Sequence, residues 1–122
     1  AVDLTKAWDE TKNGSQLVMG CLVARTEFLE QHPDAVQTFL KEYKESVDYV
    51  NNNTEEAAAL VANYKILPSA EVAKSAIPKC NIVCITGANM KTTIGGYYEV
   101  LFNAEAKSVG GKLPDDAFYY AK

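Results

Sequence analysis

Residues 33–51 form the longest stretch of the chain with a regular hydrophobic period, and that period limits how the chain can fold. Counted from Val36, the large apolar side chains recur at offsets of 3, 4, 7, 11 and 14. This spacing is that of one face of an α-helix. The residues are Val36, Phe39, Leu40, Tyr43, Val47 and Val50. The sequence therefore predicts a long amphipathic helix, whose apolar face needs a partner surface.

Both ends of this helix carry recognisable signals. Pro33 suits the first helical position, where its missing N–H costs nothing, and Asp34 complements the positive end of the helix dipole. The asparagines at 51–53 follow, and asparagine tolerates the left-handed conformation at a helix stop. We expect the apolar face to brace segment 17–25, and Phe39→Ala to cost about 3–5 kcal/mol if Phe39 is fully buried.

Two other stretches are apolar at nearly every position. Residues 16–24 and 80–86 are rich in aliphatic and β-branched side chains, without polar alternation. Runs of this kind are typical of strands buried on both faces. Gly20, in the middle of the first run, indicates simple packing, a bulge, or the close approach of a ligand or another backbone.

Shorter helix signals fill most of the remaining sequence. They lie at 3–11, 27–31, 54–65, 70–77 and 89–104, with N-cap candidates at Asp3, Thr26, Thr54 and Ser69. Gly95 and Gly96 inside the last helix favour close packing against a neighbour, and the aromatic tail at 118–120 is expected to dock onto a core. The expected fold class is α/β, a mostly helical chain with two short strands, and residues 1–122 are expected to form a single domain.

Composition excludes several classes of function. The net charge is −4, Arg25 is the only arginine, and no basic cluster exists, which argues against a nucleic-acid partner. No run of 18 apolar residues is present, so no membrane span is expected. The chain opens on a helix signal without a methionine or a signal peptide, which we interpret as a processed or cut protein.

Few residues are suited to catalysis or metal binding. The cysteines are Cys21, Cys80 and Cys84, and their odd number prevents complete pairing. We interpret them as small buried hydrophobes. His32 is the only histidine, is expected at the surface, and is accompanied by no CxxC motif. No phosphate loop, nucleophile elbow, GxGxxG or HExxH occurs, so we expect no metal, no cofactor and no enzymatic activity.

Three local patterns together resemble a known family. The first pattern is Asp3-Leu4, Trp8 and Thr11 ahead of the run 18–25. The second is Phe28-Leu29, Pro33-Asp34, Val36 and Phe39-Leu40, leading into residues 52–58. The third combines residues 78–82 with residues 110–116 and 118–120. The combination is similar to the C-terminal portion of the solute-binding protein of an ABC importer, in the nitrate, sulfonate, taurine and thiamine-precursor group. This resemblance implies a type II periplasmic-binding-protein-like fold, in which two lobes close on a ligand.

The same resemblance implies a function and a setting. The chain would be a C-terminal fragment of a two-lobed, non-enzymatic receptor for a small, anionic or heterocyclic solute, delivering it to ABC permease subunits. It would lie outside the cytoplasm, in the periplasm or lipoprotein-anchored at the cell surface, without inserting directly into the membrane. Segment 17–25 would return through the hinge, which makes Met19, Gly20 and Cys21 the candidate ligand-binding residues. Sheet edges left uncovered would let the fragment self-associate.

Two alternatives stay open. The pattern of Asp3-Leu4, Trp8 and Thr11 before an apolar strand also resembles chorismate dehydratase, an enzyme of the menaquinone pathway. That resemblance ends after the strand, whereas the transporter resemblance continues to the C-terminus. The third interpretation is a free-standing helical interaction module.

Overall fold

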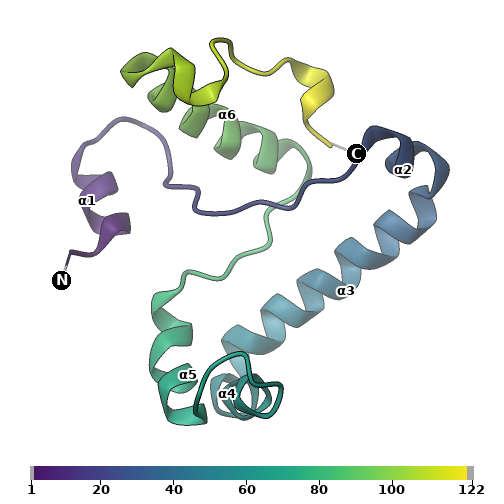
Figure 1. The fold of residues 1–122 in the computed structure, drawn as a ribbon, viewed down its shortest axis with the longest axis vertical. Coiled ribbons are helices and arrows are strands. Elements are labelled where there is room, and N and C mark those ends of the chain that lie inside the picture. The colour runs from purple at the N-terminus through teal and green to yellow at the C-terminus, as the bar shows by residue number, and fades with distance from the viewer. Residues whose placement is uncertain (1, 121–122) are drawn as a thin grey trace. The chain divides into compact units, whose positions relative to one another are not determined.

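The computed structural model describes residues 2–120, and its regular elements are helices (Figure 1). The α-helices are α1 (Leu4–Glu10), α2 (Thr26–Gln31), α3 (Pro33–Asn52), α4 (Thr54–Asn63), α5 (Ala70–Ala76) and α6 (Gly87–Ala104). The 3₁₀ helices are η1 (Ile77–Lys79), η2 (Ala106–Val109) and η3 (Asp116–Phe118). The chain groups into two compact units: Ala1–Val23 with Ile85–Lys122 forms unit 1, and Ala24–Cys84 forms unit 2. The prediction of one domain over 1–122 stays a prediction.

The two predicted strands are absent from the described residues. Segments 16–25 and 81–86 are irregular, and within the described part of the chain no backbone hydrogen bond joins 16–24 to a neighbour. A β-strand is defined by backbone hydrogen bonds to a neighbouring strand, whereas a run of apolar residues predicts only that their side chains are buried. In the second run Asn81 has a φ of 49°, so the chain turns there. The α/β class and the binding-protein-like fold are therefore wrong for residues 2–120, which are helical.

Helix α3 confirms the long helix predicted at 33–51. Pro33 occupies its first turn together with Asp34. The helix ends at Asn53 by a different mechanism from the predicted one, because the φ of Asn53 is −128° rather than left-handed. Its backbone N–H and its side-chain Nδ2 both donate to the carbonyl oxygen of Tyr49, at 2.8 and 3.2 Å. The side chain thus adds a second hydrogen bond to a carbonyl that the backbone already pairs at the helix end.

The core of unit 2 is built from small side chains. Ala57 and Ala58 of α4 lie against Ala73 of α5 and Ile77 of η1, and all four are buried. Partly buried neighbours complete this cluster: Val50, Val61, Leu67 and Ile82. Alanine on both helices lets their backbones approach closely, because little side-chain volume separates them.

Helix α5 is also fixed at its N-terminus and from the side. The Ser69 hydroxyl oxygen accepts a hydrogen bond from the Val72 N–H at 3.2 Å, which confirms the predicted N-cap. The Lys74 ammonium lies 3.0 Å from the Glu55 carboxylate of α4. Both groups are largely exposed, so this ion pair contributes little to stability.

The apolar face of α3 is covered only in part. Val36 and Val47 are buried, but Phe39 is 49% exposed and Tyr43 is also exposed. The rings of Phe39 and Tyr43 stack on each other, with centroids 5.7 Å apart. The periodicity therefore identified the correct face, while the assumption of a fully buried Phe39 is wrong.

Unit 1 contains α1, the irregular segment after it up to Val23, α6 and the segments that follow α6. The Asp3 carboxylate accepts from the Lys6 N–H at 3.2 Å, so the predicted N-cap of α1 is confirmed. The C-terminal tail docks onto α6, as predicted: the Phe118 ring lies 6.1 Å from that of Tyr98 in an edge-to-face arrangement. An ion pair of 2.7 Å between Lys91 and Asp116 holds η3 beside the same helix.

Candidate functional site

The three sequence-predicted site residues lie together on an extended part of unit 1. Met19 is 76% exposed, and Gly20 and Cys21 are exposed as well. An added Cβ at Gly20 would meet no atom within 4 Å, so no described group approaches this glycine closely. The site assignment stays a prediction.

A hydrogen-bonded turn positions the start of this segment. The Trp8 indole N–H donates to the carbonyl oxygen and the hydroxyl oxygen of Ser15, at 3.3 and 3.2 Å. The Asn13 side-chain oxygen accepts from the Ser15 N–H and hydroxyl, at 2.9 and 2.8 Å. The Asn13 amide in turn donates to the Thr11 hydroxyl at 2.7 Å. Trp8 and Thr11, which the sequence pattern singled out, therefore belong to a local hydrogen-bond network that fixes where the extended segment begins.

Sequence reasoning missed the role of Ser15 in this network. The signal was present in Asn13-Gly14-Ser15, since an asparagine side chain commonly bonds the backbone two residues on. The bond from Trp8 to Ser15 depends on how the chain folds back after α1, which no local pattern predicts.

A row of aromatic rings connects α1, α6 and the tail within unit 1. The ring centroids of Trp8 and Tyr97 are 5.2 Å apart, those of Tyr97 and Tyr98 are 6.5 Å apart, and those of Phe118 and Tyr119 are 5.2 Å apart. Burial raises the pKa of the Tyr119 phenol above its ordinary value. These contacts are those of a packed aromatic cluster, which supports the neighbouring turn and segment.

Gly95 and Gly96 of α6 lie next to Tyr119 of this cluster and next to Ser15, respectively. A Cβ added to Gly96 would be 3.5 Å from the Ser15 Cβ, and one added to Gly95 would be 3.9 Å from the Tyr119 hydroxyl oxygen. Each glycine therefore has a neighbour, but not one close enough to exclude a Cβ, so the predicted close packing is not what the structure shows. Because the distances are ordinary van der Waals contacts, the packing does not require glycine.

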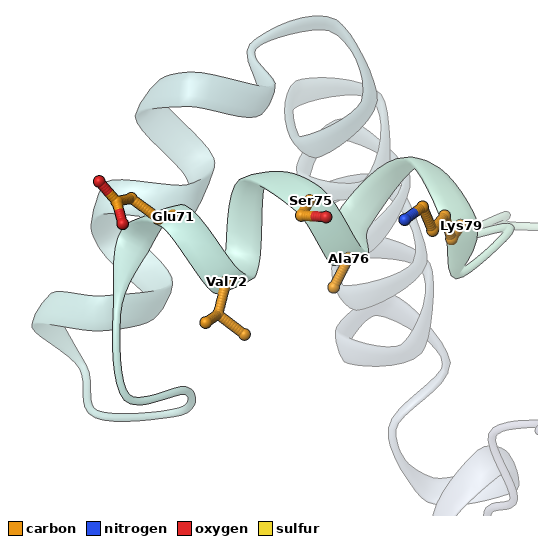
Figure 2. Close-up of a pocket in the computed structure, with 5 residues that line it drawn as sticks. All are labelled: Glu71, Val72, Ser75, Ala76 and Lys79. Carbon is orange, nitrogen blue, oxygen red and sulfur yellow. The ribbon is translucent and has the colours of Figure 1, made fainter.

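An open depression lies on the outer side of α5 and η1 in unit 2 (Figure 2). Val72 and Ala76 project to the same side of the helix, while Glu71 and Lys79 lie toward its two ends. Ser75 adds a hydroxyl group. Such an open surface does not enclose a small ligand, and buried polar groups that would orient one are absent from its lining. None of the predicted site residues belongs to it.

The remaining titratable and nucleophilic side chains are dispersed. His32 is exposed at the surface, as predicted, with its ring 4.9 Å from that of Phe28. The prediction of buried cysteines is wrong, since Cys21 and Cys80 are exposed and Cys84 is half-buried. Among residues 2–120, no group of three or more His, Cys, Asp or Glu side chains could hold a metal ion. No helix in the same range is long and apolar enough to cross a bilayer.

A helical chain with an exposed apolar segment after a hydrogen-bonded turn defines no function by itself, so comparison with known proteins is informative. The model of a family described as menaquinone biosynthesis matches residues 1–97. The match covers well over half of the chain, and the chain belongs to this family. No curated protein matches the chain, and no solved structure does.

The family membership corrects three predictions. The resemblance to an ABC-importer solute-binding protein is wrong, and the transport function drawn from it is wrong with it. The expectation of a non-enzymatic protein is also wrong, because the family is one of a biosynthetic pathway. Of the alternatives, the menaquinone-pathway enzyme is the one supported. The expected permease partners, self-association and extracytoplasmic location stay predictions that no observation tests.

Proposed function

We propose that this chain acts in menaquinone biosynthesis as a chorismate-dehydratase-like protein. The observation that carries the proposal is the family match over residues 1–97. This range includes Asp3-Leu4, Trp8 and Thr11 and the apolar segment after them, on which the resemblance to chorismate dehydratase rests. The match also extends far beyond that segment.

The proposed reaction is a simple elimination. Chorismate carries a hydroxyl group on a cyclohexadiene ring. Removal of a ring proton and of that hydroxyl group releases one water, and the ring becomes aromatic. The gain in aromaticity favours the product, so the protein must orient the ring and assist the movement of one proton.

Met19, Gly20 and Cys21 are the proposed ligand contacts. A thioether and a thiol are polarisable groups that pack well against an unsaturated ring. Gly20 between them leaves room for the ligand to approach the backbone, since no described atom lies near its missing Cβ. We assign these residues to binding and orientation, and we assign no acid or base.

Complementation of a strain that lacks its own chorismate dehydratase tests the proposal, with cellular menaquinone as the readout. The gene should restore menaquinone, and Gly20→Val should reduce the restored amount without loss of protein. Met19→Ala should also reduce it, whereas Tyr64→Ala should not. Met19 and Tyr64 are matched in exposure, at 76% and 74%. A strain that stays devoid of menaquinone while the protein accumulates would contradict the proposal.

A further inference from the structure

Ser15 is the point of unit 1 where the turn after α1 contacts both α1 and α6. Its hydroxyl and carbonyl oxygens both accept from the Trp8 indole N–H, at 3.2 and 3.3 Å. A Cβ added to Gly96 of α6 would lie 3.5 Å from the Ser15 Cβ. The Trp8 ring lies against Tyr97 of the same helix, with centroids 5.2 Å apart. Ser15 is therefore held from two sides, and every one of these contacts lies inside unit 1.

The hydrogen bonds around Ser15 form one directed chain that begins and ends at Trp8. The indole N–H donates to the Ser15 hydroxyl, which donates to the Asn13 side-chain oxygen at 2.8 Å. The Asn13 amide donates to the Thr11 hydroxyl at 2.7 Å, and that hydroxyl donates to the Trp8 carbonyl oxygen, also at 2.7 Å. Bonds aligned in this way polarise and strengthen one another, so the turn resists distortion as a unit.

The chain beyond Ser15 lacks such support on its way to the candidate ligand contacts. The N–H and the carbonyl of Ser15 are both hydrogen-bonded, whereas within the described residues of unit 1 no backbone hydrogen bond is made by residues 16–23. At about 3.4 Å per residue, Met19 lies at most about 14 Å from Ser15. A rotation of about 5° at Ser15 can then move Met19 by about 1 Å, and a misplacement of that size costs up to about 100-fold in rate.

We propose that Ser15 is a positioning residue, which sets the direction of the segment that carries Met19, Gly20 and Cys21. The proposal rests on the proposed function for what this segment binds, and on the contacts inside unit 1 for how the segment is held. Ser15 acts through these three residues rather than by touching the ligand. Because the turn is ordered before the ligand arrives, less conformational freedom is lost on binding.

NMR of the ¹⁵N-labelled chain tests how the segment is held. Trp8 is the only tryptophan, so a single indole N–H resonance reports on the bond to Ser15. In Ser15→Ala this resonance should move, and the backbone order parameters of residues 16–21 should fall from about 0.85 towards about 0.6. Ser69→Ala is the matched control, because it removes a serine hydroxyl that caps a helix of unit 2, and it should leave both readouts unchanged.

Steady-state kinetics with chorismate test what the position serves. Ser15→Ala should raise KM about tenfold and change kcat less than about twofold, since binding is weakened while the chemical step is retained. Asn13→Asp keeps an oxygen that accepts from Ser15 and should leave KM near the wild-type value, whereas Asn13→Ala should raise it. Ser69→Ala should leave KM unchanged.

These outcomes separate the positioning role from the proposed function. A wild-type chain that leaves chorismate unchanged contradicts the proposed function, and the order parameters alone then decide whether Ser15 holds the segment. Order parameters of residues 16–21 that Ser15→Ala leaves unchanged would overturn the positioning role. With an active wild type, a KM that Ser15→Ala does not raise, or that Ser69→Ala raises equally, would overturn it as well.

Discussion

Helices α4 and α5 differ instructively from helix α6, although all three carry small residues in their interiors. Ala57, Ala58 and Ala73 are buried at the contact between α4 and α5, where little space separates the helices. Gly95 and Gly96 of α6 also face neighbours, but a Cβ at either position would sit at an ordinary contact distance. A small residue in a helix therefore indicates close packing only where it is also buried.

The strongest test of this difference enlarges the most deeply buried alanine. Ala73 has no exposed surface, so Ala73→Leu should destabilise unit 2 by about 3 kcal/mol through overpacking. Val72→Leu, on the exposed side of the same helix, should change stability by less than about 0.5 kcal/mol. Urea unfolding followed by circular dichroism measures both, and an equal effect of the two variants would contradict the assigned core.

A second test compares Val47 and Phe39 of helix α3, because the smaller side chain, that of Val47, is the more deeply buried of the two. Val47→Ala should cost about 2 kcal/mol, because Val47 is only 7% exposed and its removal leaves a cavity. Phe39→Ala should cost about 1 kcal/mol despite the larger side chain, since half of it is already in water. If Phe39→Ala lowered the unfolding midpoint more than Val47→Ala, the Phe39 side chain in the middle of α3 would be covered rather than exposed.

Enlarging a glycine of α6 should raise the stability of the protein, whereas enlarging Ala73 should lower it. Gly96→Ala should stabilise the protein by about 0.5–1 kcal/mol, because alanine favours the helix and its Cβ fits beside Ser15. The thermal unfolding midpoint should rise accordingly. A fall of the midpoint would mean that α6 and the turn at Ser15 approach more closely than an alanine allows.

The smallest expected effect is a pH dependence in the aromatic cluster of unit 1. Burial raises the pKa of Tyr119 in the folded state, so the unfolded chain loses this proton first as pH rises. The contribution to stability is complete below the unfolded pKa of about 10 and is lost as pH rises through the folded pKa. Between about pH 8 and about pH 10.5, Tyr119→Phe should lose less stability than the wild type. If urea titrations showed that the wild type and Tyr119→Phe lose the same stability over this pH range, the burial of Tyr119 would be contradicted.

The helices were predictable because their signals are local. The 3.6-residue period of α3, Pro33 at its start and the caps at Asp3 and Ser69 all act within a few residues of the chain. The strands were not predictable in the same way. The apolar runs at 16–24 and 80–86 have strand-like composition, but a ladder needs a partner that no local pattern reveals.

The candidate site was less predictable than the fold. Met19, Gly20 and Cys21 were selected by resemblance rather than by their chemistry, and the structure places them together without testing their role. The network that positions them was partly visible, since Asn13-Gly14-Ser15 predicts a turn. The hydrogen bond from Trp8 to Ser15 and the ring contact from Trp8 to Tyr97 depend on tertiary packing.

The most direct test of the account is the fate of chorismate in the presence of the purified protein. Mass spectrometry and proton NMR would follow the loss of one water and the appearance of an aromatic ring. The account predicts a product smaller than chorismate by one water, formed in proportion to protein concentration and more slowly with Gly20→Val. Chorismate that persists at its uncatalysed rate in the presence of the folded protein would contradict the proposed function.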